Sequence, residues 1–341
     1  MKLVQIPFKE VDLHPDFYNS NFHTSVEAPN LPIPTEKPQS FIRWLPLTAS
    51  SQSIPWSSIQ IITLTPAQSE LILSASLASL HTREPNRLYT EELASLALSA
   101  HFNSLDFPPE GLFLRLDECS AKDGVGGTTA LRSVEEVILR LSTSHRATNA
   151  MVRWRDQYRE SNAQEDAGEA DGSAVSVGME LVFLPCDERM DTRREFRVFC
   201  APRQGRITGV SQYRWHQPSF LSGENTEVVQ KVTSEIMGEV VRIHEEILTE
   251  AWKEEAEAMD RLLLEQGFSF DVLFVEEPVG SERVRANKKG KCVMMELNSF
   301  GARSGCGSCL FHWLRDLDVL YGGKTEHGSE GIEKVEFRIS T

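Results

Sequence analysis

The stretches FDVLFV (residues 270–275) and CVMMELNSF (residues 292–300) decide the predicted fold of this chain. Both are short, apolar and rich in residues that favour strands. The segment between them is polar and contains Pro278, Gly280 and the run KKGK at residues 288–291. Two such stretches separated by a polar, turn-forming segment are typical of a β-hairpin. We therefore predict two antiparallel strands joined by a long loop.

Three oxygen-bearing side chains fall inside this hairpin. Glu296 and Asn298 are two residues apart on the second strand, so they share a face, and Asp271 in the first strand can meet them across the ladder. Two carboxylates and an amide oxygen suit a hard cation such as Mg²⁺, with phosphate oxygens and water as the remaining ligands. The alternative is a pair of ordinary strands whose polar residues face water.

Composition limits the class of protein. The chain has 341 residues, 40% of them hydrophobic and 25% charged, which is typical of a soluble globular protein with one large domain or two smaller ones. A formal net charge of -15 argues against nucleic acid as a sequence-independent partner. No apolar run approaches the ~18 residues of a membrane span, and the first ten residues are unlike a secretory signal. Six irregularly spaced cysteines favour reduced thiols, so we predict a cytoplasmic protein without a membrane partner.

The predicted domain organisation has four parts. Residues 1–40 are rich in proline and are interpreted as an extended arm. Residues 156–177 combine acidic residues with Ala, Gly and Ser, which predicts a flexible insertion, with an acidic docking tail as the alternative. The two remaining parts, 41–155 and 178–341, alternate strands and helices and are predicted to be the N-terminal and C-terminal lobes of an α+β protein.

Capping signals and periodicity locate the elements of the two lobes. Thr65 with Gln68, and Ser133 with Glu136, match the spacing of a capping box. Gly238 lowers helix propensity inside the apolar pattern of residues 224–266, so this segment is one long helix or two. Strands are predicted at residues 58–63, 111–116, 179–184, 195–200 and 206–213, and helices after Thr65, at 90–101, after Ser133 and at 224–266, ending before Gly267.

Three further polar clusters join the hairpin as candidate sites. The first is Arg115 with the loop SAKDG (residues 120–124), which suits polyphosphate binding but also fits an exposed turn. The second is Arg197 beside Glu195, for which a weak surface ion pair is the alternative. The third is Arg214 at the end of the strand 206–213. Cys306 and Cys309 form a CxxC without a second pair, which favours a structural role.

Five motifs follow one another along the chain: LRLDECSAKDG (residues 114–124), EFRVFC (195–200), VSQY (210–213), FDVL (270–273) and MELNSF (295–300). An FxW (residues 311–313) and a terminal FRI (337–339) come after them. In this order the motifs resemble the cell division cycle 123 family, a divergent branch of the ATP-grasp fold. The resemblance extends from about residue 40 to the end of the chain.

The resemblance implies two α+β lobes with antiparallel sheets that sandwich ATP. It implies a Mg²⁺ site made of Asp271, Glu296 and Asn298, and catalytic cations at Arg197 and Arg214. An adenine-binding hinge is implied at residues 182–186. The residues implied to bind ATP are Arg115, Ser120, Lys122, Asp123, Val182, Phe183, Leu184 and Arg197.

The chain departs from the family pattern at several matched positions. Arg115 stands where the family has Lys, Glu118 where it has Trp, and Glu296 where it has Asp, while the proline before Lys122 is missing. The charge type is kept at every phosphate and metal position, so Mg-ATP binding is expected to survive. Replacing Asp271 or Glu296 with alanine is expected to abolish that binding while the fold stays intact.

Two functions follow from the resemblance. The first, which we favour from the sequence, is an ATP-dependent ligase that joins a small carboxylate to an amine through an acyl phosphate, in the biosynthesis of secondary metabolites. The second is the family's own role, an ATP-binding assembly chaperone for translation initiation factor 2 that binds its γ subunit. An ATP-binding scaffold without turnover is a third possibility.

Overall fold

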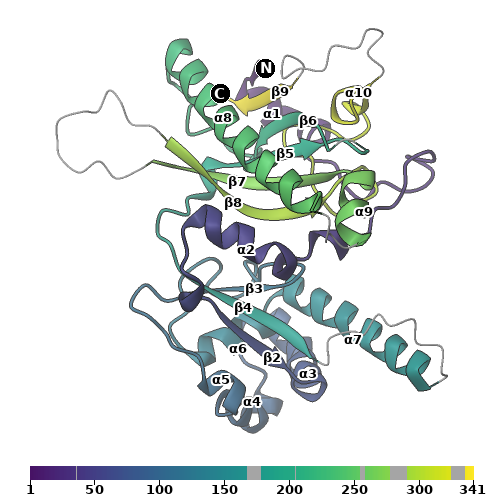
Figure 1. The fold of residues 1–341 in the computed structure, drawn as a ribbon. Helices are drawn as coiled ribbons and strands as arrows, with labels where there is room; N and C mark the ends of the chain where they lie inside the picture. Colours follow the sequence, from purple (N-terminus) through teal and green to yellow (C-terminus); the bar gives the residue numbers. More distant parts are fainter. Residues whose placement is uncertain (36, 167–177, 204, 254–257, 277–289, 324–334) are drawn as a thin grey trace. The chain divides into compact units, whose positions relative to one another are not determined.

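The computed structural model describes residues 1–341 except 36, 167–177, 204, 254–257, 277–289 and 324–334. The chain divides into two compact units, which are drawn in Figure 1. Unit 1 contains residues 1–53 and 188–341, and unit 2 contains residues 54–187. No helix among the described residues is both long and apolar enough to cross a membrane.

Unit 1 is built on a six-stranded sheet with the order β1-β9-β6-β5-β7-β8. Strand β9 runs parallel to both β1 and β6, and the remaining neighbours are antiparallel. The α+β class is as predicted, but this sheet is mixed because the two ends of the chain enter it side by side in the same direction. Its strands are β1 (Lys2–Ile6), β5 (Glu195–Cys200), β6 (Ile207–Gln212), β7 (Phe268–Glu276), β8 (Gly290–Ser299) and β9 (Glu336–Ser340).

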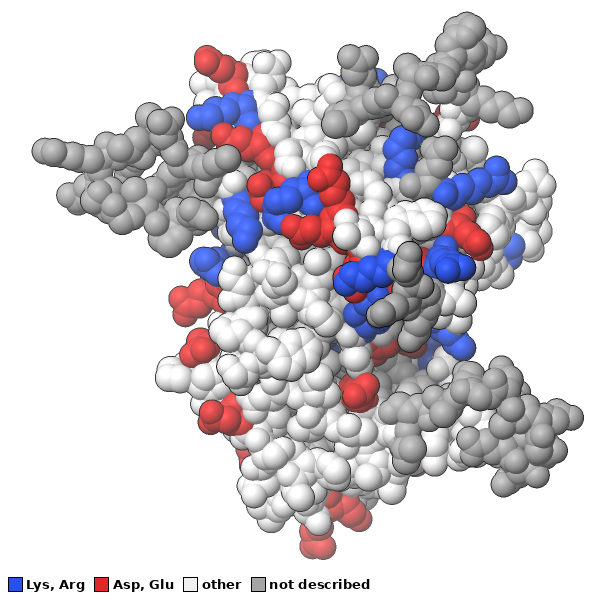
Figure 2. All heavy atoms as spheres, viewed as in Figure 1, with Lys and Arg blue, Asp and Glu red and all other residues white. Residues whose placement is uncertain are grey.

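One face of this sheet is apolar and is covered by α8 (Thr226–Ala251) and α9 (Ala258–Gln266). Val240, Ile243 and Ile247 of α8 are fully buried against strand residues such as Phe270 and Val272. The segment predicted at 224–266 is therefore two helices, and Gly238 lies inside the first of them. Figure 2 shows acidic and basic side chains next to one another over α8, the helix on which Arg242 forms ion pairs with Glu239 and Glu246.

The edge of the sheet at β8 is covered by α2 (Phe41–Gln52). The amide of Met294 donates to Ser51 Oγ (2.8 Å), and Gln52 Nε2 donates to the Met294 carbonyl (2.7 Å). Covering an edge in this way satisfies strand groups that would otherwise pair with another chain. Helix α2 therefore belongs with unit 1, whereas the sequence placed it in the N-terminal lobe. The prediction missed this contact because β8 is far from α2 in the sequence.

Residues 1–40 also differ from the predicted arm. Besides β1, they contain α1 (Phe8–Leu13) and short 3₁₀ turns at Pro15–Phe17 and Lys37–Gln39. Strand β1 pairs in register with β9, from Lys2 opposite Glu336 to Ile6 opposite Ser340. The proline content indicated a segment without regular structure, but pairing with the C-terminal strand stabilises five of its residues as a strand.

Unit 2 is an antiparallel three-stranded sheet, β2-β4-β3, whose apolar face packs on helices. The predicted cap at Thr65 is a full capping box, and Ser133 Oγ accepts from the Glu136 amide. Unit 2 contains a 3₁₀ turn at Trp56–Ser58, β2 (Gln60–Leu64), α3 (Pro66–Thr82), a 3₁₀ turn at Arg87–Tyr89, α4 (Thr90–Ala97), α5 (Ala100–Asn103), β3 (Leu112–Leu116), α6 (Val134–Ser142), α7 (His145–Asp166) and β4 (Met179–Pro185).

Helix α7 corrects the predicted boundary of the acidic insertion. The insertion was predicted to begin at residue 156, yet the helix continues to Asp166. The stacked rings of Trp154 and Tyr158, and the ion pairs of Arg155 and Arg159 with Glu70 of α3, stabilise this part of the helix. The rest of the predicted insertion, residues 167–177, lies outside the described residues.

Candidate functional site

The predicted hairpin is present as β7 and β8, and its register places Asp271 directly opposite Glu296. The ladder shifts by one residue between Asp271 and Val272, since Val272 is opposite Met294 and leaves Met295 as the extra residue of a β-bulge. Asp271 and Leu273 share a face of β7, and they lie opposite Glu296 and Val293 of β8. These two residues of β8 are three apart, and the extra residue of the bulge is what places both on that face. The loop residues 277–289 lie outside the described part of the chain.

Polar residues continue from this pair across the sheet. Asp271 is opposite Arg197 of β5, Arg197 is opposite Ser211 of β6, and Ser211 is opposite Arg338 of β9. We call the side of the sheet that carries Glu296, Asp271, Arg197, Ser211 and Arg338 the Asp271 face. It is the side opposite to the apolar face under α8.

The centre of the Asp271 face is a buried ion pair. Arg197 donates through Nε and Nη2 to the two carboxylate oxygens of Asp271, both at 2.7 Å, and the two residues are 6% and 0% exposed. Burial alone would lower the pKa of Arg197, but the Asp271 carboxylate outweighs that effect and holds the pKa well above its ordinary value. The predicted alternative of a surface ion pair is therefore excluded for Arg197.

A C-terminal segment covers the pair. Arg197 Nη1 contacts Cys306 Sγ (3.2 Å) and donates to the Gly307 carbonyl (2.9 Å), while its guanidinium lies 5.0 Å from the centre of the Tyr213 ring. Cys306 Sγ also contacts Ser269 Oγ at 3.1 Å. Burial raises the pKa of the Cys306 thiol even though Arg197 is adjacent. The CxxC motif, interpreted as structural from the sequence, thus contacts the candidate site directly.

Two of the predicted metal ligands lie beside Asp271. Asn298 Nδ2 donates to Asp271 Oδ2 at 3.1 Å, and Glu296 and Asn298 are both half-buried. Asp271 Oδ2 therefore accepts from both Arg197 Nη2 and Asn298 Nδ2, while Oδ1 accepts from Arg197 Nε. A half-turn of the Asn298 amide would place its oxygen where its nitrogen is now.

Asp271, Glu296 and Asn298 supply two carboxylates and one amide, and oxygen donors of this kind fit a hard cation. Three side chains are too few to complete its coordination. Among the described residues, no three His, Cys, Asp or Glu side chains are gathered in a way that could hold a metal ion. Phosphate oxygens and water would have to complete the coordination of Mg²⁺, as they do in most sites of this metal. Arg214, the second predicted catalytic cation, follows β6, and its carbonyl accepts from Gln212 Nε2.

The predicted ATP-binding residues of unit 2 are only partly brought together. Arg115 is 6% exposed, bridges to Ser120 and lies opposite Val182, on the side of the sheet away from the helices. Lys122 is half-buried in the following loop. Phe183 is different, because its side chain is part of the apolar core on the other side.

The predicted adenine hinge begins inside a central strand. The ladder with β2 extends from Met179 to Phe183, and the ladder with β3 includes Val182, Phe183 and Leu184. The backbone groups of Val182 and Phe183 therefore lie between two paired strands. Leu184 is the first of the three predicted residues beyond the ladder with β2, so backbone recognition of a base would begin there.

Asp123 occupies a structural position. One carboxylate oxygen accepts from Ser144 Oγ and the other from the Arg146 amide (3.2 Å), at the first turn of α7. An acidic side chain there satisfies amides that have no partner within the helix. The sequence of the loop SAKDG did not reveal this role because the two groups that donate to Asp123 are more than 20 residues away in the chain.

We expect Asp123→Ala to lower the free energy of unfolding of unit 2 by about 1 kcal/mol, the usual contribution of such a cap. Asp123→Asn keeps one acceptor oxygen and should lose less. Denaturant unfolding followed by circular dichroism compares the two variants. Equal stability of Asp123→Ala and the unchanged protein would contradict this assignment.

Comparison with known proteins yields only structural likeness. No protein-family model matches the chain, and no curated protein matches it either. Cdc123 from Schizosaccharomyces pombe is similar in structure, with 16% sequence identity over 88% of this chain and 95% of that chain and a TM-score of 0.48. A C-terminally truncated Cdc123 from the same organism has 16% identity over 89% and 96% of the two chains and a TM-score of 0.46. These solved structures are from the family that the motifs resemble.

Proposed function

We propose that this protein binds Mg-ATP with the Asp271 face and acts as an ATP-binding assembly chaperone for translation initiation factor 2, through the γ subunit of that factor. The observation that carries the nucleotide part is the group of Asp271, Glu296 and Asn298 on one face, directly beside Arg197. Carboxylate and amide oxygens suit the metal of a bound Mg-polyphosphate, and Arg197 holds Asp271 in position for it. Cations at Arg115 and Lys122 are proposed to contact the phosphate oxygens.

The state of Arg197 favours binding over turnover. A phosphoryl-transfer enzyme places cations where charge develops on the transferred group. Here Arg197 is almost fully buried and is held by Asp271, Cys306 and Gly307, so it orients the carboxylate and has little freedom to follow a reacting phosphate. The assembly role itself comes from the resemblance of the five motifs, which also cover these residues.

Glu296→Gln is expected to weaken Mg-ATP binding about tenfold or more, because it removes a charge from the metal ligands and keeps the size of the side chain. Glu296 is half-buried and lies outside the Arg197–Asp271 ion pair, so the fold should be retained. Calorimetric titration with ATP in Mg²⁺ and in EDTA measures the metal-dependent part. Glu265→Gln on the exposed side of α9 is the matched control. Unchanged Mg-ATP affinity in Glu296→Gln would refute the site.

A second experiment separates the chaperone from the ligase. The chaperone predicts that the γ subunit of initiation factor 2 co-purifies with the protein and that Glu296→Gln weakens this association. ADP release that rises when a small carboxylate and an amine are added together would instead establish the ligase. Co-purification and ADP release are separate readouts of the same protein, so each function can be tested whatever the other assay gives.

A further inference from the structure

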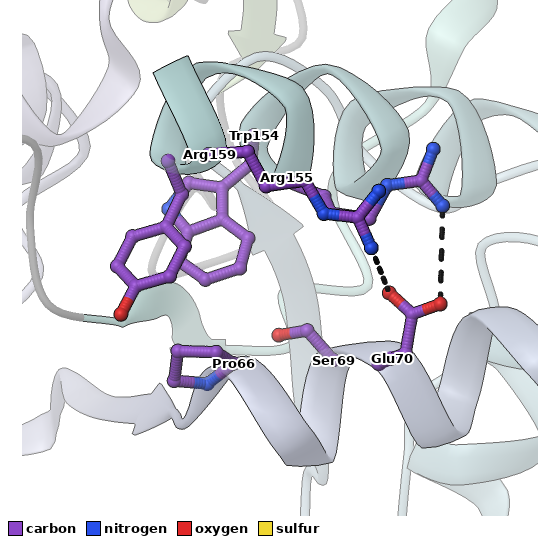
Figure 3. A pocket seen from close by; sticks show the side chains of 7 residues that line it. Pro66, Ser69, Glu70, Trp154, Arg155 and Arg159 are labelled. Carbon is purple, nitrogen blue, oxygen red and sulfur yellow. Dashed lines mark ion pairs between the residues drawn. The ribbon is translucent and has the colours of Figure 1, made fainter. Parts of the chain in front are cut away.

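A second candidate site lies in unit 2, apart from every residue assigned to ATP. It is a cavity of about 200 Å³ between the first turns of α3 and the middle of α7. Figure 3 shows the side chains that reach it from the two helices. All of its lining residues belong to unit 2, so the site is complete within one compact unit.

One side of the cavity is aromatic. Trp154 and Tyr158 are four residues apart on α7 and therefore share a face, and their rings stack with centroids 5.3 Å apart and planes 14° from parallel. Pro66 of α3 also lines the cavity, and Figure 3 shows it below Trp154. Flat rings above a proline favour a planar, apolar group between them.

Two buried polar atoms at this cavity have no hydrogen-bond partner among the described residues: Ser69 Oγ and Trp154 Nε1. Ser69 is only 1% exposed, and Figure 3 shows its hydroxyl directed from α3 toward the rings. A buried donor without a partner costs free energy, so such atoms usually have a ligand or a water molecule. Both groups can donate, which calls for a ligand that carries acceptor atoms.

The other side of the cavity is cationic. Arg155 and Arg159 both face Glu70, with nitrogen–oxygen distances of 3.9 and 3.8 Å. These distances are beyond hydrogen-bond length, so Glu70 orients the two guanidinium groups without forming direct hydrogen bonds to them. Arg155 Nε also pairs with Asp156 Oδ1 at 3.1 Å, so Glu70 and Asp156 together balance the two guanidinium groups. A ligand carboxylate would therefore take the place of Glu70 at these cations.

From these features we propose that the cavity binds a small planar carboxylate about the size of benzoate. Its ring would lie against Trp154 and Tyr158, and its carboxylate would accept from Ser69, the indole N–H and the arginines. The cavity has the volume of about seven water molecules at ~30 Å³ each, which is enough for one ring and one carboxylate. Glu70 competes with the ligand for the same cations.

The test uses the full-length protein without nucleotide and benzoate as the probe, with affinity measured by calorimetry and ligand-observed NMR. Benzoate should bind at least tenfold more tightly than acetate, which lacks the ring, or benzyl alcohol, which lacks the charge. Added salt should weaken benzoate binding, because part of the attraction is electrostatic at a partly exposed site. Absence of benzoate binding at millimolar concentration, or equal binding of acetate, would overturn the proposal.

Two variants are expected to change the affinity for benzoate in opposite directions, which a nonspecific effect on the protein would not do. Arg159→Gln should weaken benzoate binding about tenfold, as expected for a charge-assisted contact, whereas Glu70→Gln should strengthen it by removing the competing carboxylate. Arg153→Gln is the control, because Arg153 lies on α7 but pairs with Glu118 and does not line the cavity. Weaker binding in Glu70→Gln, or equal effects of Arg153→Gln and Arg159→Gln, would refute the assignment. Trp154→Phe keeps a ring and isolates the contribution of the indole N–H.

This proposal does not depend on the proposed function. Glu296→Gln is expected to lose Mg-ATP binding and to bind benzoate unchanged. Arg159→Gln is expected to lose benzoate binding and to keep the affinity for Mg-ATP. Loss of both ligands in either variant, with the fold intact by circular dichroism, would contradict a separate carboxylate site.

Discussion

Asp271→Ala should lower the free energy of unfolding of unit 1 by about 3–5 kcal/mol, the usual cost of removing one partner from a buried ion pair. Arg197 would remain in place, 6% exposed, with its charge no longer balanced by the carboxylate. Within the described part of the chain, its guanidinium would keep contacts with a thiol, a carbonyl oxygen and an aromatic ring. Denaturant unfolding of the full chain, followed by far-UV circular dichroism, measures the loss.

A double variant provides the control for this prediction. Arg197→Met with Asp271→Leu removes both charges and fills the space with apolar groups, so it should be much more stable than Asp271→Ala alone. Similar stability of Asp271→Ala and the unchanged protein would show that Arg197 and Asp271 do not form a buried ion pair in solution. From the sequence we expected that Asp271→Ala would abolish ATP binding in an intact fold. The structure changes that expectation, and Glu296 is the residue with which to test the metal site.

The local patterns of this chain were sufficient to predict most of its elements. Alternation predicted β5 with its observed bounds, and the Thr65 capping box predicted the start of α3. The hairpin around Asp271 was also predicted, because apolar strands and a polar loop are signals within a few residues of each other. The bulge at Met295 was not predicted, since a one-residue shift in register leaves no mark on a short apolar strand.

Long-range contacts were the part that the sequence did not reveal. Strand β1 looked like an arm because its partner, β9, is at the other end of the chain. Helix α2 looked like part of the N-terminal lobe because its contacts with β8 are about 240 residues away. The same applies to Asp123, whose cap on α7 is invisible in the loop that contains it.

The segment around Cys306 and Gly307, which covers Arg197, is the most informative feature that the sequence did not reveal. The sequence placed Cys306 in a CxxC of structural type and noted the FxW at residues 311–313 separately. In the structure the two motifs are linked, because Trp313 Nε1 donates to the Cys306 carbonyl at 2.9 Å while Cys306 Sγ contacts Arg197. The tryptophan of the FxW therefore positions the loop that closes the Asp271 face.

Trp313→Ala is expected to lower the free energy of unfolding of unit 1 by about 3–5 kcal/mol, the range for truncating a large buried aromatic side chain. Trp313 is 0% exposed and packs edge-on against Phe199 and Phe300, with ring centroids 5.5 and 4.8 Å away. The change also leaves the Cys306 carbonyl without its donor. Denaturant unfolding measures the total loss, and Trp252→Ala is the matched control because Trp252 is 65% exposed.

The link to the Asp271 face adds a second, local result. Trp313→Phe keeps much of the packing but removes the hydrogen bond to the Cys306 carbonyl, so the covering loop should open more often than in the unchanged protein. Alkylation of Cys306, measured by mass spectrometry of its peptide, should then become faster, while that of Cys200, buried on the opposite face, stays the same. Equal acceleration at both cysteines would indicate general unfolding, and unchanged alkylation of Cys306 would show that Trp313 does not hold the loop over Arg197.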